Sequence, residues 1–147
     1  MARLPDGTLD YENPDTLDLP LIKQCLRELS ETGKTVLPIY DFTGVIGISG
    51  ERQGCVYFTA HRDLLRQLLL HVGEADVSDN NLCDLVGEIA NTISGNARRH
   101  FGPNFMISVP VVVAGNARAI QVPKDIKAYI LPLKWHKLEA AMIASLR

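Results

Sequence analysis

Hydrophobic positions recur every three or four residues in the middle of the chain, which is the spacing of one face of an α-helix. This pattern predicts a long helix from a cap at Ser78 or Asp79 to about Phe101, where a Gly-Pro pair ends it. The same spacing predicts a shorter helix over about 62–72 and another over about 18–33. Three helices are therefore expected, and the last of them is the longest.

Runs rich in β-branched and aromatic residues predict the strands of a sheet. A hairpin is expected between Gly44 and Phe58, with its turn over 50–54. The last two strands are joined by a short link at Trp135 and His136, which indicates an antiparallel pair. Beyond the hairpin, strands are expected over 105–114, 126–133 and 138–146, with weaker candidates over 36–40 and 119–122.

These elements predict an α+β fold in which helices pack on a mostly antiparallel β-sheet. Residues 1–18 are polar and turn-prone and include five acidic side chains, so we expect an N-terminal arm there. Residues 19–147 are long enough to build one hydrophobic core and are expected to form a single domain.

Composition excludes several classes of function. The chain has 147 residues, 46% of them hydrophobic, and a net charge of -2, which gives no basic surface for nucleic acid. It has no signal-peptide layout and no apolar run near the roughly 18 residues that cross a bilayer, so we expect a cytoplasmic protein without a membrane partner. Its three cysteines and four histidines lack metal-ligand spacing, and neither a bound metal nor a cofactor is expected.

The long helix carries a narrow polar stripe, formed by Asp84, Glu88, Asn91 and Gly95, which we call the motif stripe. At 100° per residue these four positions fall within about 60° of one another and point away from the predicted core. The arc expected to face the core contains the apolar residues Leu82, Leu85, Val86, Ile89, Ile93 and Ala97. The helix therefore separates a buried face from a small polar one.

Two glycines in this helix need a physical reason, because each costs roughly 1 kcal/mol relative to alanine in a helix interior. Gly87 and Gly95 permit close approach of another backbone, so a partner protein could dock here, with Arg98 beside the stripe to meet acidic groups. The plain alternative is that glycine allows packing against the protein's own sheet. Glutamate and asparagine three residues apart are also common on solvated helices.

The pattern Asp84-x-x-x-Glu88-x-x-Asn91, within the segment DLVGEIANTISGNA, resembles the signature of the CheX, CheC and FliY chemotaxis phosphatases. The preceding segment GVIGISGERQGCVYF is similar to the hairpin that precedes the signature helix in that family. The family pattern continues to a downstream proline, for which Pro110 is the candidate, although its spacer is slightly short. One copy of the signature favours the CheX-like type.

This resemblance implies a CheC/CheX-like fold and a phosphatase that dephosphorylates a CheY-like response regulator. It implies that Asn91 orients the attacking water, that Glu88 anchors the receiver domain, and that Asp84 helps docking at the rim. Mg²⁺ would come from the response regulator, and the family precedent is a homodimer. The competing interpretation is a non-catalytic module that docks a receiver domain or a flagellar-switch component through the same helix.

Overall fold

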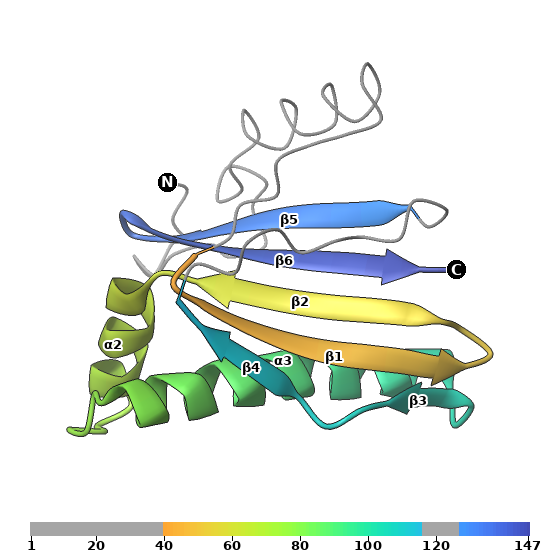
Figure 1. Cartoon of the computed structure of the whole chain (residues 1–147), viewed down its shortest axis with the longest axis horizontal. Helices are drawn as coiled ribbons and strands as arrows, with labels where there is room; N and C mark the ends of the chain where they lie inside the picture. The colour runs from red at the N-terminus through yellow and green to blue at the C-terminus, as the bar shows by residue number, and fades with distance from the viewer. Residues whose placement is uncertain (1–39, 116–126) are drawn as a thin grey trace, which may run out of the picture.

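The computed structural model describes residues 40–115 and 127–147, which form an antiparallel sheet with two helices on one of its faces (Figure 1). The predicted α+β class is confirmed. Strands follow the order β3-β1-β2-β6-β5 across the sheet, and β4 also pairs with β1. In chain order the elements are β1 (Phe42–Gly50), β2 (Gly54–Ala60), α2 (Arg62–His71), α3 (Asp79–Phe101), β3 (Phe105–Ile107), β4 (Val111–Ala114), β5 (Ala128–Trp135) and β6 (Leu138–Leu146).

Most of the predicted elements appear at their expected places. The prediction is matched closely by the hairpin β1–β2, by the helices α2 and α3, and by β6. Strand β5 ends at Trp135 instead of residue 133. Four predicted segments lie outside the described residues, apart from Tyr40. They are the arm over 1–18, the helix over 18–33 and the strands over 36–40 and 119–122.

The prediction of a single strand over 105–114 is wrong, because this segment forms two strands separated by Ser108, Val109 and Pro110. Ile48 of β1 pairs with Ile107, and Val45 pairs with Val111, so three residues lie opposite the two residues 46 and 47. One extra residue in one strand of an antiparallel pair is a β-bulge, which interrupts the ladder. Proline has no N–H to donate to the ladder and reinforces the break.

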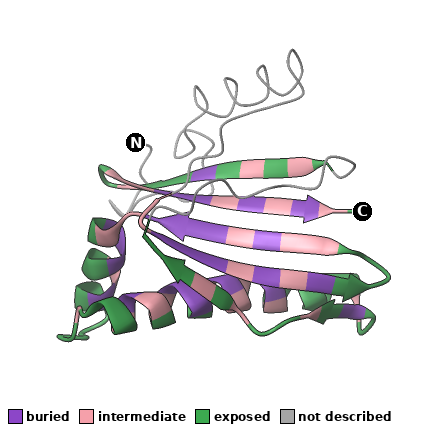
Figure 2. Cartoon of the chain, viewed as in Figure 1, coloured by how far each residue is buried: buried purple, intermediate pink, exposed green. Residues whose placement is uncertain are grey.

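Helix α3 packs very closely on β1, at a glycine. A Cβ atom on Gly44 would lie 3.0 Å from both Cγ1 and the carbonyl oxygen of Val86, and 3.3 Å from Cβ of Ala90. Figure 2 shows buried positions gathered on the central strands β1, β2 and β6. The small residues at this contact therefore set how near the helix lies to the sheet.

The core-facing arc of α3 is rotated from the predicted one. Its buried residues are Leu82, Val86, Gly87, Ala90 and Ser94. The other members of the predicted arc are only partly buried, although they pack against the core: Leu85, Ile89, Ile93 and Ala97. The prediction missed small residues because they contribute little hydrophobicity, whereas close packing against Gly44 favours them.

The start of α3 is fixed by polar contacts. Ser78 is the N-cap, and its Oγ accepts from the N–H of Asn81 at 3.5 Å. The Arg62 guanidinium at the start of α2 donates two hydrogen bonds to the carboxylate of Asp79 and lies 5.0 Å from the ring centroid of Phe42. This pairing joins the first turns of the two helices to β1 and so positions the motif stripe.

Candidate functional site

The motif stripe lies outside the buried face of α3. Asp84 and Glu88 are exposed, whereas Asn91 and Gly95 are half-buried. Within residues 40–115 and 127–147, the side chains of Glu88 and Asn91 make no hydrogen bond or ion pair. Both polar groups are therefore available to a molecule that approaches this face.

Gly87 is buried, so its absence of a side chain has an internal explanation. A Cβ atom there would lie 3.3 Å from Cγ2 of Val112 and 3.7 Å from Cγ of Pro110. The plain alternative, packing against the protein's own sheet, accounts for this glycine. A direct contact between Gly87 and a partner would require the neighbouring strand to move.

Gly95 has the opposite surroundings. A Cβ atom at this position would meet no heavy atom within 4 Å. The glycine is therefore not required by packing inside the described parts of the chain. Arg98, about one turn further on, is exposed and belongs to the last turn of the helix. Its positive charge there interacts favourably with the negative end of the helix dipole.

The bulge borders the motif stripe. Pro110 contacts the position of Gly87, which is one turn before Asn91 on the same side of the helix. Sequence reasoning singled out Pro110 but missed this proximity, because pairing between β1 and β4 creates it. The only sequence signal is the proline inside an otherwise β-rich run.

Electrostatics around the stripe argue against a cysteine nucleophile. Burial raises the pKa of the Cys83 thiol, and the carboxylates of Asp79 and Asp84 raise it further. The thiolate is the reactive form of cysteine, so this thiol stays protonated and unreactive near neutral pH.

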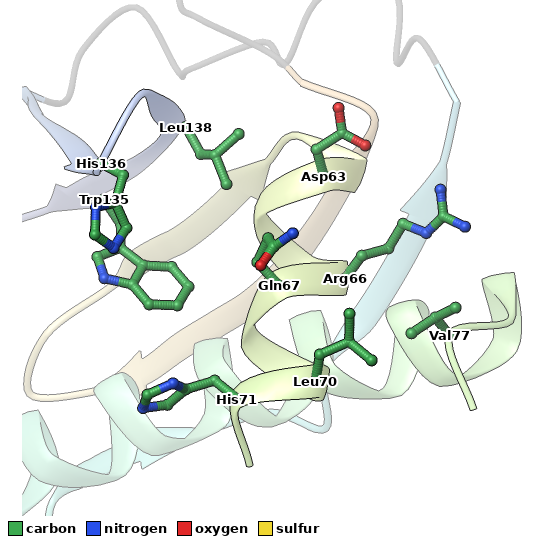
Figure 3. Close-up of a pocket in the computed structure, with 9 residues that line it drawn as sticks. All are labelled: Asp63, Arg66, Gln67, Leu70, His71, Val77, Trp135, His136 and Leu138. Carbon is green, nitrogen blue, oxygen red and sulfur yellow. The ribbon is translucent and has the colours of Figure 1, made fainter. Parts of the chain in front are cut away.

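A pocket lies elsewhere, between α2 and the turn that joins β5 to β6 (Figure 3). Trp135 forms one wall, with the His71 ring edge-on to it at a centroid distance of 5.8 Å. Arg66 and Gln67 supply polar groups, and no α3 residue lines the pocket. It is therefore a separate feature from the motif stripe.

In the described part of the chain, no three His, Cys, Asp or Glu side chains are grouped so that they could hold a metal ion. No helix there is long and apolar enough to span a membrane.

A protein-family model described as "Chemotaxis phosphatase CheX" matches residues 42–134, well over half of the chain. The chain belongs to the CheX chemotaxis phosphatase family. The matched segment contains the hairpin, the motif stripe and the bulge. Membership was the expectation drawn from the signature, and it is confirmed.

Solved structures share the CheX-family fold. Chemotaxis protein CheX from Vibrio vulnificus has a TM-score of 0.66 and 21% identity, covering 88% of this chain and 95% of its own. A CheC-like chemotactic protein from Shewanella oneidensis has a TM-score of 0.67 and 24% identity, covering 90% and 98%. The Borrelia burgdorferi CheX-CheY-BeF₃-Mg²⁺ complex has a TM-score of 0.63 and 21% identity, covering 94% and 98%. Among curated proteins, no sequence matches this chain.

Proposed function

We propose that the chain is a protein-aspartyl-phosphate phosphatase, in which Asn91 orients the water that attacks a phosphorylated CheY-like receiver domain. The observation that carries this proposal is the availability of the Asn91 amide, which is half-buried beside the buried face of α3 and makes no hydrogen bond within the described residues. An amide can both donate and accept a hydrogen bond, as water orientation requires.

The chemistry suits a side chain that is not a strong base. An aspartyl phosphate is already an activated anhydride, so hydrolysis mainly needs a water molecule held in line with the phosphorus atom. A hundredfold acceleration corresponds to about 2.7 kcal/mol of barrier lowering. One well-placed amide on a rigid helix is enough for an effect of this size.

Glu88 is the proposed anchor. It is exposed on the same stripe, three residues before Asn91, so both side chains can reach one partner. The resemblance to the chemotaxis phosphatases implies that the counterpart of Glu88 pairs with a conserved lysine of the receiver domain. A charge-assisted hydrogen bond in a site that loses water on docking would add affinity and fix the register.

The stripe's other positions would complete the docking surface. Asp84 is exposed at its start, and Gly95 and Arg98 continue the surface along the helix. Mg²⁺ is expected to come with the substrate, and the related Borrelia complex holds CheY together with BeF₃ and Mg²⁺. The metal would shield the phosphoryl charge while Asn91 positions the water.

The alternative is a non-catalytic module that docks a receiver domain or a flagellar-switch component through this helix. The free amide of Asn91 favours the phosphatase, because docking alone does not need a water-orienting group. Turnover separates the two functions. Catalytic amounts of a phosphatase exhaust an excess of phosphorylated receiver domain, whereas a docking module protects at most one equivalent.

The decisive experiment measures loss of phosphoryl label from a receiver domain with the wild-type protein, Asn91→Ala and Glu88→Ala. We expect Asn91→Ala to lose about a hundredfold in kcat with little change in affinity, and Glu88→Ala to weaken affinity. Wild-type rates in Asn91→Ala contradict the proposal. Equal losses of affinity in both variants contradict the separate roles.

Self-association stays a prediction. We expect a homodimer from the family resemblance, with the motif stripe left accessible in each protomer. Sedimentation of the purified chain tests it, and a monomer at all concentrations contradicts it.

A further inference from the structure

The bulge of Ser108, Val109 and Pro110 presents one apolar side chain to solvent. Val109 is 81% exposed, the largest value among the large hydrophobic residues of the described ranges. An exposed apolar residue is common and needs no explanation by itself. What distinguishes Val109 is the way the backbone holds it and the surface it adjoins.

The bulge changes the alternation of side chains along this edge of the sheet. Phe105 and Ile107 of β3 pair with residues of β1 that face α3, and so does Val112 of β4. An uninterrupted strand would put odd-numbered residues on one face throughout, so one residue is displaced between the two strands. Bulges that re-aim a side chain in this way are over-represented next to active sites.

Hydrogen bonds hold the bulge in one conformation. The Gly47 N–H donates to Oγ of Ser108 at 2.9 Å, and the Ser108 N–H donates to the carbonyl oxygen of Gly47 at 2.9 Å. The Ser108 hydroxyl donates to the carbonyl oxygen of Val109, also at 2.9 Å. A backbone held in one conformation before binding loses little conformational entropy on docking.

The bulge is continuous with the motif stripe. Pro110 packs on Gly87, whose neighbour along the chain is Glu88 and whose neighbour one turn later is Asn91. In Figure 1 the link between β4 and β3 runs along the outer edge of the sheet, beside α3. A globular partner that brings its active site to Asn91 therefore meets this edge as well.

We propose that Val109 is an apolar anchor that determines how tightly the phosphorylated receiver domain docks. This inference rests on the proposed function, because the receiver domain is the partner that has to reach Asn91. Val109 would be covered on docking and would contribute to affinity, whereas the Asn91 amide would act in the hydrolytic step.

Steady-state dephosphorylation of a receiver domain by Val109→Ser tests the anchor. Val72→Ser is the matched control, because Val72 is 74% exposed and lies beyond the end of α2. Burying a valine side chain on docking supports a loss of about tenfold in affinity when serine replaces it. We expect Val109→Ser to raise KM about tenfold at unchanged kcat, and Val72→Ser to match the wild type.

Several results would overturn the anchor and leave the phosphatase assignment intact. An unchanged KM in Val109→Ser, a fall in kcat alone, or an equal rise of KM in Val72→Ser each contradicts it. Loss of self-association in Val109→Ser, with an unchanged KM, would assign the residue to a contact between two copies of the chain.

Failure of the proposed function gives a different pattern. If the wild-type protein does not turn over phosphorylated receiver domain, binding is measured by titration with receiver domain loaded with BeF₃ and Mg²⁺. About tenfold weaker binding by Val109→Ser than by Val72→Ser supports the anchor in a docking module. Equal binding by the two variants overturns it.

Discussion

Gly95 offers the sharpest test of whether α3 contains a residue that lowers stability but favours docking. It lies in the interior of the helix, where glycine is about 1 kcal/mol less favourable than alanine. The methyl group of Gly95→Ala would meet no heavy atom within 4 Å, so no steric cost offsets the gain in helix propensity. We expect the free energy of unfolding to rise by about 1 kcal/mol and Tm to rise by about 2–4 °C.

The same methyl group would stand on the surface proposed to receive the receiver domain. We therefore expect Gly95→Ala to raise KM for phosphorylated receiver several-fold while kcat changes little. Thermal unfolding monitored by circular dichroism and steady-state dephosphorylation are measured on the same preparation. A more stable protein that binds its partner less well is the signature of a residue retained for function.

Gly87→Ala is the matched control, since Gly87 lies in the same helix but faces the protein's own strand. Its methyl group would lie 3.3 Å from Cγ2 of Val112, so the new contact offsets the gain in helix propensity. We expect a smaller gain in Tm than Gly95→Ala gives. An unchanged Tm in Gly95→Ala refutes the stability argument, and a raised Tm with unchanged KM removes Gly95 from the docking surface.

Two further predictions concern the scaffold. The Arg62 guanidinium lowers the pKa of the Asp79 carboxyl, so this pair stabilises the fold above about pH 3.8, and the contribution is lost as the pH falls below that value. Asp79→Asn should therefore unfold more easily than the wild type at pH 7 and show a shallower loss of Tm in acid. Parallel curves of Tm against pH for the two proteins would contradict this. Gly44→Ala should destabilise by about 1–3 kcal/mol through overpacking against Val86, whereas an unchanged denaturant midpoint would show that α3 moves away freely.

The sequence predicted best what depends on local signals. Ser78 caps α3 as expected, and the glycines of the β1–β2 turn mark the hairpin, because caps and turns are decided by a few adjacent residues. The polar stripe was also visible, since a fixed rotation per residue places Glu88 and Asn91 on one side.

Features that depend on pairing between distant segments were not predictable from local patterns. The bulge exists because β3 and β4 both pair with β1 while three residues oppose two, and no single run of residues encodes that mismatch. The rotation of the buried face of α3 has the same origin. It follows from the fit of Ala90 against Gly44, and Gly44 precedes α3 by more than 30 positions.

These two missed features together explain how the candidate site is held. Close packing at Gly44 fixes the height of α3 above the sheet, and the contact of Pro110 with Gly87 fixes the flank beside the motif stripe. Asn91 therefore lies on a helix that is constrained by the sheet at Gly44 and by Pro110 at one flank, while its amide makes no hydrogen bond within the described residues. Water orientation needs such a group, because an amide that had to be ordered at each encounter would lose much of its effect to entropy.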